Sequence, residues 1–142
     1  LVLLGDGELM ESIKVKAEEL DLKNKVLFVG NVGNANEWYS AFDVFVLPSI
    51  WEGLPVVGVE AQASDLPCIF SDGVTQEIGL TDKVQFVPLK APESEWVQAF
   101  EKALSIKERK DNTVLIREKN YDIETEAIKL QNRYLKLAEE IR

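Results

Sequence analysis

The amino-acid sequence predicts an α/β fold, with a parallel sheet flanked by helices and a helical C-terminal tail. Five short apolar runs recur within residues 1–87, and each is continuous rather than alternating, which is typical of parallel strands buried on both faces. Stretches with helical spacing separate these runs, and the resulting rhythm indicates β-α-β units. The 142 residues are enough for one domain with its own core, so we expect a single domain over residues 1–142.

The expected strands are the apolar runs themselves, at residues 1–4, 26–29, 44–47, 67–70 and, more weakly, 84–87. The expected helices cover residues 7–20, 36–42, 55–64, 93–106, 111–119 and 123–141. Three of these helices carry apolar stripes that should pack against a core. The stripes are Leu9, Ile13, Ala17 and Leu20; Trp96, Val97, Phe100, Ala103 and Leu104; and Ile123, Ala127, Leu130, Tyr134, Leu137 and Ile141.

The composition excludes several classes of function. The net charge of −9 disfavours binding to nucleic acid or to acidic lipid headgroups. The absence of histidine removes His-based triads and His metal sites. The single cysteine, Cys68, cannot form a disulfide framework, suits a reducing compartment and is typical of a small buried hydrophobe. No apolar run is long enough to cross a membrane. Because the sequence starts on a strand without Met, we expect a fragment of a longer protein.

Ligands of parallel sheets bind at the loops that follow the strands. Four such loops, at residues 5–7, 30–34, 48–55 and 71–73, are rich in glycine or small polar residues. The Gly5-Asp6-Gly7 turn could offer backbone N–H groups to an anion, but it lacks the third glycine of a dinucleotide fingerprint and the lysine of a P-loop. A tight strand-to-helix turn is therefore the favoured interpretation.

The third loop carries more information. A helix starting near residues 54–55 would have Pro55 in its first turn, with free N–H groups pointing out of it. Glu60 is the only charge between Gly53 and Ala63, so we expect a mostly buried helix whose carboxylate needs a partner, such as a pair of ligand hydroxyls. The alternatives are that Glu60 is solvated at an exposed edge and that Glu52 is merely an acid placed favourably near a helix N-terminus.

The segment 43–61, DVFVLPSIWEGLPVVGVEA, resembles the GT4-type (group 1) retaining glycosyltransferases, and is closest to bacterial enzymes of capsule and exopolysaccharide synthesis. The family hallmark is two glutamates separated by seven residues, and Glu52 and Glu60 match it. Residues 4–7, 26–32, 38–43 and 71–72 are similar to further family segments in the same order. The resemblance implies a three-layer Rossmann-like domain, one half of a GT-B fold, that binds a nucleoside-diphosphate sugar.

The resemblance also implies a role for each matching residue. Glu60 would bind the ribose hydroxyls, and Glu52, the catalytic candidate, would orient the transferred sugar. The remaining donor-binding candidates are backbone groups and small side chains that would border the diphosphate, the sugar or the base: Gly53, Leu54, Pro55, Val56, Val32, Gly5 and Gly7. Pro55 has no N–H to donate.

The family context further implies a cytoplasmic hexosyltransferase that uses no metal or other cofactor. Its partners would be the nucleotide sugar and an N-terminal acceptor domain of the same longer chain, with peripheral contact to the inner membrane face. The family's Arg/Lys pair precedes the point where this sequence begins, so we expect residues 1–142 alone to be inactive. If the terminal helices cross to the missing half, their exposed apolar face would invite self-association.

Other interpretations stay open at this point. A non-enzymatic α/β nucleotide-binding or receiver-like module would need an acidic cluster after its first strand, where Asp6 stands alone, and a sugar-nucleotide epimerase would need more acid–base groups. Ser64-Asp65 replaces the family's usual glycine, and Asp65 can adopt the left-handed conformation at modest cost. We expect Trp96 and Phe100 in the core, a solvated turn at 106–111, and Trp51 either over the sugar site or closing its loop.

Overall fold

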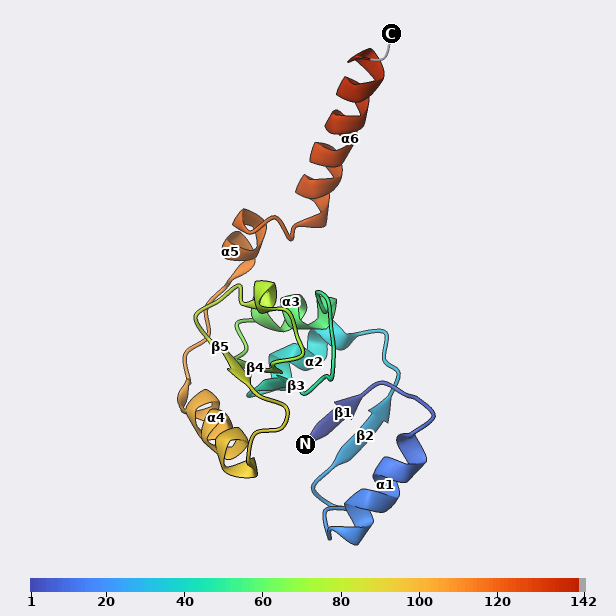
Figure 1. Ribbon diagram of the computed structural model, residues 1–142, viewed down its shortest axis with the longest axis vertical. Coiled ribbons are helices and arrows are strands. Elements are labelled where there is room, and N and C mark those ends of the chain that lie inside the picture. Colours follow the sequence, from blue (N-terminus) through green and yellow to red (C-terminus); the bar gives the residue numbers. More distant parts are fainter. Residues whose placement is uncertain (141–142) are drawn as a thin grey trace. The chain divides into compact units, whose positions relative to one another are not determined.

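A computed structural model describes residues 1–140 of the chain. The chain forms two compact units, Leu1–Trp38 and Tyr39–Arg142 (Figure 1). Within residues 1–140, none of the helices combines the length and the apolar character of a membrane-spanning segment.

The first unit is a β-α-β unit, as the sequence predicts. Strands β1 (Val2–Leu4) and β2 (Leu27–Gly30) pair in parallel and are connected through helix α1 (Met10–Glu19). The expected burial of the α1 stripe is wrong, since only Ala17 is buried while the leucines and the isoleucine of the stripe are exposed. A two-stranded sheet in so small a unit offers too little surface to cover the whole stripe.

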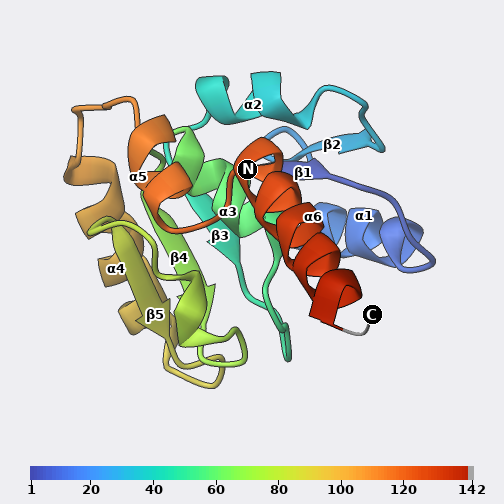
Figure 2. The same cartoon turned by 90° about the horizontal axis from the view of Figure 1, so that it is seen from above.

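The second unit contains a three-stranded parallel sheet in the order β3-β4-β5, with β4 in the centre (Figure 2). Each predicted strand and helix is present with ends that differ by at most three residues, and the short helix η1 (Gln76–Ile78) is an addition that the sequence did not predict. The elements from residue 35 onward are α2 (Ala35–Ala41), β3 (Phe45–Leu47), α3 (Val56–Ala63), β4 (Cys68–Ser71), η1 (Gln76–Ile78), β5 (Val84–Val87), α4 (Glu93–Ser105), α5 (Thr113–Glu118) and α6 (Ile123–Glu140).

The strand register gives this sheet two apolar faces, because successive side chains point to opposite sides. Phe70 lies on the face that α3 covers, and a Cβ added at Gly58 of α3 would come within 3.0 Å of its ring. Ile69 lies on the opposite face and packs with Val87 against Ala99 and Ala103 of α4. Helix, sheet and helix therefore form three layers within this unit (Figure 1).

The core of the second unit confirms several expectations. Trp96 and Phe100 pack against the cluster under α4, and Cys68 is fully buried. Burial raises the pKa of the Cys68 thiol to about 12, so the group is an inert thiol rather than a nucleophile. Full burial of every strand was too broad a prediction. Among the strands of residues 1–140, only β4 is buried at all its positions, because it alone has a strand on each side.

Three helices end in the same way, with an Asp or Asn in the left-handed conformation. Asp21, Asp65 and Asn120 follow α1, α3 and α5 with φ values of 55°, 56° and 66°. After α3, the N–H of Asp65 bonds to Gln62 O and the N–H of Leu66 to Ala61 O, which is the Schellman pattern. Asp65 thus closes its helix without glycine, as predicted.

Helix α6 differs from the expectation of ordinary packing. None of its residues is buried, and Leu130, Tyr134 and Leu137 of the predicted stripe are exposed. The helix extends away from the sheet of its unit (Figure 1), and its apolar face is not covered by the rest of that unit within the described residues. The last residue of the predicted stripe, Ile141, lies outside the described residues.

Candidate functional site

The loop between β3 and α3 is fixed by backbone hydrogen bonds to the segment after β4. The Glu52 N–H donates to Gly73 O at 2.9 Å, and the Thr75 N–H donates to Glu52 O at 3.3 Å. Gly73 is required for this close approach, because a Cβ there would lie 2.2 Å from the backbone oxygen of Ile50. The backbone of Glu52 is thus held by the segment that directly follows β4.

The Glu52 side chain is half-buried and faces a hydroxyl. Ser49 Oγ lies 3.5 Å from Glu52 Oε1, a long hydrogen bond. The carbonyl of Ser49 accepts a hydrogen bond from the Ser71 hydroxyl, which ties the loop to the end of β4. Trp51, beside Glu52, is 79% exposed, so its side chain does not close the loop by packing, and cover over a sugar stays a prediction.

Helix α3 begins at Val56, with Pro55 at the N-cap position rather than inside the first turn. No side chain caps this end, and Val56 is 67% exposed. The first N–H groups of a helix have no partner within the helix and carry the positive end of its dipole. The backbone from Gly53 to Val56 therefore leads into an open helix end that suits an anion.

Glu60 lies on the exposed side of α3, which corrects the prediction of a mostly buried helix. The buried side consists of Gly58, Ala61 and Gln62, while Val56, Val57 and Glu60 face outward. The sequence does not show which face of α3 is buried, because small apolar residues occur on all sides of the helix. The carboxylate is nevertheless held, because the Tyr39 hydroxyl donates to Glu60 Oε2 at 2.9 Å.

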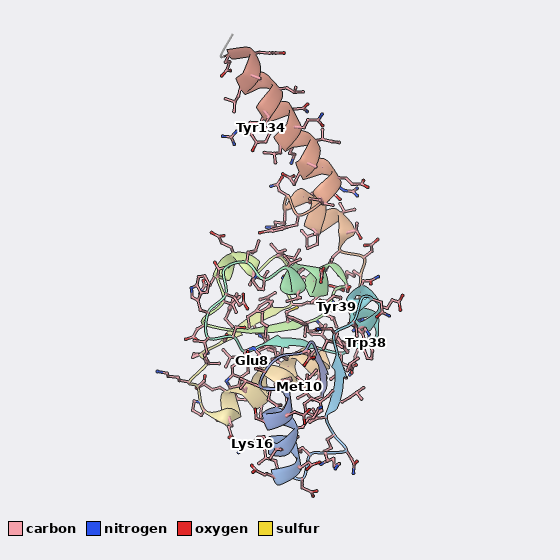
Figure 3. The ribbon with its side chains drawn as sticks, turned by 90° about the vertical axis from the view of Figure 1, so that its right-hand side faces the viewer. Glu8, Met10, Lys16, Trp38, Tyr39 and Tyr134 are labelled. Atoms are coloured by element: carbon pink, nitrogen blue, oxygen red, sulfur yellow. The ribbon has the colours of Figure 1, made fainter. Side chains whose placement is uncertain are left out.

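Tyr39 comes from the second half of α2 and is one of the most buried residues of its unit, at 3% exposure. Figure 3 labels it beside Trp38. Its ring meets the edges of Phe42 and Phe45, with centroid distances of 6.5 and 6.2 Å. Burial, together with the hydrogen bond to Glu60 and the negative charge there, raises the pKa of the Tyr39 hydroxyl, so the group stays protonated and donates.

Two polar clusters that the sequence analysis missed hold this region together. The fully buried Gln62 amide donates to Gly58 O and Ile78 O and accepts from the N–H groups of Leu80 and Thr81. It fastens α3 to the chain around η1. A lone glutamine on an apolar helix face was the available signal, since a buried amide must be fully paired.

The second cluster is centred on Asp65. Its carboxylate accepts from Lys83 Nζ at 2.6 Å, from the Lys110 N–H and from Asn112 Nδ2 at 2.8 Å. Burial alone would raise the pKa of Asp65, but these hydrogen bonds and the charge of Lys83 hold it below its ordinary value. The segment 106–111, predicted as a solvated turn, is therefore largely exposed but is held by the hydrogen bond from the Lys110 N–H to Asp65. From the same segment, Arg109 donates to the carbonyls of Tyr39 and Ser40 near the end of α2.

The candidates of the first unit lie around its own strand ends. The Gly5 N–H donates to Gly30 O at the end of β2 at 2.8 Å, and the Gly7 N–H donates to Asp6 Oδ1 within the turn at 2.8 Å, so both N–H groups have partners. Gly5 needs its glycine for a φ of 115°. Val32 is half-buried in the loop after β2. The candidates of the second unit, from Glu52 to Glu60, lie on one continuous segment.

Comparisons with known proteins show the family of the chain. The family model of glycosyl transferases group 1 matches residues 1–105. The putative glycosyltransferase EpsF of Bacillus subtilis (strain 168) is 45% identical over 107 residues, which are 72% of this chain and 27% of that protein. An Escherichia coli protein named UDP-Gal:alpha-D-GlcNAc-diphosphoundecaprenol alpha-1,3-galactosyltransferase is 44% identical over 72 residues, 50% of this chain and 19% of that protein.

A solved structure shares the fold. Sucrose-phosphate synthase from Thermosynechococcus elongatus superimposes with a TM-score of 0.77 over 99% of this chain and 39% of that one, at 21% sequence identity. The α/β fold predicted from the sequence is thereby confirmed. The chain spans about a quarter of the length of the EpsF protein. The family match over most of its length shows that the chain belongs to the group 1 glycosyl transferases.

Proposed function

We propose that the chain is the donor-binding part of a retaining hexosyltransferase and that it binds a nucleoside-diphosphate sugar. The observation that carries the proposal is the pair Glu52 and Glu60 of a group 1 chain, the first in the loop between β3 and α3 and the second within α3. One carboxylate stands before an uncapped helix N-terminus, and the other lies about 6 Å along the helix axis from its first residue. This spacing suits a ligand with a sugar at one end and a ribose at the other.

The proposed roles follow the chemistry of each group. The Glu60 carboxylate is an acceptor for the paired ribose hydroxyls, and Glu52 accepts from hydroxyls of the transferred sugar. The backbone of residues 53–56 faces the diphosphate, where the N–H groups of Val56 and its neighbours supply donors and Pro55 supplies none. Gly5, Gly7 and Val32 of the first unit remain candidates for the border of the donor and for contact with the base.

Sugar transfer in this scheme depends on electrostatics more than on covalent chemistry. The sugar passes through an oxocarbenium-like state while negative charge develops on the departing diphosphate. A helix N-terminus stabilises part of that charge, but cationic side chains are needed for the rest. The sequence has no Lys or Arg between Lys25 and Lys83. We therefore propose that residues 1–142 alone bind the donor weakly and do not transfer sugar.

The rest of the enzyme is proposed from the relatives. The named E. coli relative acts on a diphosphoundecaprenol-linked sugar, and Vi polysaccharide biosynthesis protein VipC/TviE of Salmonella typhi is another relative. A lipid-linked or growing polysaccharide is accordingly the proposed acceptor, bound by a separate N-terminal domain of a longer cytoplasmic protein. We further propose that donor binding needs no metal ion, so that excess EDTA should leave the donor affinity unchanged.

The exposed face of α6 has a place in this proposal. In a longer chain it would pack against the acceptor-binding half, and in the isolated chain it would drive self-association. The support is the row of exposed apolar side chains along the helix, among them Leu130, Tyr134 and Leu137.

Calorimetric titration with UDP-, GDP- and ADP-type sugar nucleotides tests the proposed function. The Glu60→Ala chain should lose roughly tenfold or more in affinity for the nucleotide that binds, because a hydrogen bond to a charged group contributes about 1.5–3 kcal/mol. Glu77→Ala, which removes an exposed acid of η1, is the matched control and should bind like the wild type. Equal affinity of the Glu60→Ala and wild-type chains would contradict the ribose role.

A further inference from the structure

We propose that Tyr39 is a positioning residue of the donor site, whose hydroxyl holds the Glu60 carboxylate in the orientation that binds the ribose. The inference rests on the proposed function, because Tyr39 acts only through Glu60. It assigns a task to a buried hydroxyl on α2 that the glutamate motif of α3 does not include.

The hydroxyl of Tyr39 is held in place from two directions. The ring is buried against Phe42 and Phe45, and the Phe45 ring in turn meets Phe70 of the central strand at 6.2 Å. The backbone is held as well, since Arg109 Nη1 donates to Tyr39 O at 3.3 Å and to Ser40 O at 3.2 Å. Because neither ring nor backbone is free to shift, the hydroxyl is a fixed reference point beside α3.

Glu60, in contrast, has little else to orient it. It lies on the exposed side of α3, and within residues 1–140 Tyr39 is the one hydrogen-bond donor to its carboxylate. An exposed glutamate samples many rotamers, and ordering such a side chain on binding costs about 0.5–1.5 kcal/mol, or roughly 2- to 10-fold in affinity. The hydrogen bond from Tyr39 orders the Glu60 side chain already in the free chain, so ligand binding does not have to order it. It engages Oε2 and leaves Oε1 as the acceptor for a ligand hydroxyl.

The competing explanation is that Glu60 merely satisfies a buried hydroxyl and fastens α2 to α3. That role would affect the stability of the fold but not the recognition of ribose. The two explanations therefore differ in how the loss of the Tyr39 hydroxyl affects a nucleotide with ribose hydroxyls and one without them.

The experiment uses the whole chain as wild type and as Tyr39→Phe, Glu60→Ala and the double variant. Affinities are measured by calorimetry for UDP, GDP and ADP and for the 2′,3′-dideoxy analogue of whichever binds. We expect Tyr39→Phe to weaken the ribonucleotide by about 2- to 10-fold and the dideoxy nucleotide by much less. In the Glu60→Ala background, the same change should have no further effect. Tyr134→Phe, on exposed α6 (Figure 3), is the control for loss of a tyrosine hydroxyl and should match the wild type.

Two results would overturn the inference while leaving the proposed function intact. One is a Tyr39→Phe chain that binds the ribonucleotide like the wild type, although Glu60→Ala does not. The other is an equal loss of affinity for both nucleotides in the Tyr39→Phe chain, which would indicate that the Tyr39–Glu60 hydrogen bond only stabilises the fold. If Glu60→Ala itself binds normally, or the wild type binds none of the three nucleotides, the proposed function fails and the role of Tyr39 fails with it.

A second measurement covers the case in which Tyr39→Phe does not fold. In chains labelled with ¹³C at tyrosine Cζ, the Tyr39 resonance should differ between wild type and Glu60→Ala. It should move again when the wild type is saturated with the nucleotide that binds. A Tyr39 resonance that the nucleotide leaves unchanged would contradict the inference.

Discussion

Asp65 combines two tasks in one side chain. Its backbone closes α3 in the left-handed conformation, while its carboxylate gathers the side chain of Lys83, the N–H of Lys110 and the amide of Asn112. We expect Asp65→Ala to lower the free energy of unfolding by about 3 kcal/mol, because removing one partner leaves a nearly buried lysine uncompensated. Chemical denaturation checks this value.

Asp21 provides the matched control for the Asp65 substitution. It has the same φ at the end of α1 but is exposed and has no such partners. Asp21→Ala should therefore cost only the strain of the left-handed conformation, about 1 kcal/mol. Equal losses at the two positions would show that the carboxylate cluster contributes nothing.

The same cluster makes stability depend on pH. The pKa of Asp65 is lowered in the folded chain, so the unfolded chain binds more protons as the pH falls past the ordinary aspartate value of 3.8. The stabilisation is complete above that value and is lost as the pH falls through the lower pKa of the folded state. Denaturation curves recorded from neutral to acidic pH should thus be flatter for Asp65→Asn than for the wild type. Parallel curves would refute this origin.

At the scale of the elements, the attachment of α3 to the chain around η1 depends on one buried side chain, Gln62. Gln62 pairs with one carbonyl of its own helix, Gly58 O, and with the Ile78 carbonyl and two N–H groups around η1. Gln62→Leu keeps the approximate volume but removes the amide that joins α3 to Ile78 O and to the N–H groups of Leu80 and Thr81. The Leu80 N–H and Ile78 O still bond to each other, so we expect a loss of about 1–3 kcal/mol in the free energy of unfolding. Gln98→Leu, on the exposed side of α4, should stay within about 0.5 kcal/mol of the wild type. Thermal and chemical denaturation of both variants decide between these values.

Elements and faces differed in how far the sequence could predict them. The strands were located to within about a residue, because continuous apolar runs bounded by turn residues have few alternatives. The buried and exposed faces of α3 and α6 could not be predicted in this way, because they depend on which other elements pack against each helix. The hydrogen bond between Tyr39 and Glu60 joins residues 21 positions apart, and the one between Asp65 and Asn112 joins residues 47 positions apart. Local sequence patterns do not predict such distant pairs.

At the scale of the whole molecule, the uncovered face of α6 should control association. Leu130→Lys places a charge in the apolar row, so it should reduce self-association without changing the free energy of unfolding by more than about 0.5 kcal/mol. Asn132→Lys adds the same charge outside the row and should leave association unchanged. Sedimentation velocity over a concentration series measures both effects. A wild-type chain that stays monomeric throughout would contradict the proposal.

The central claim is that Glu60 recognises the hydroxyl pair of a nucleotide's ribose. Its most direct test is the ratio between the affinities for a nucleoside diphosphate and for its 2′,3′-dideoxy analogue. We predict a ratio of about ten or more for the wild-type chain and close to one for Glu60→Ala, since the removed carboxylate is the group that distinguishes the two ligands. A ratio that is the same in both chains would contradict the account.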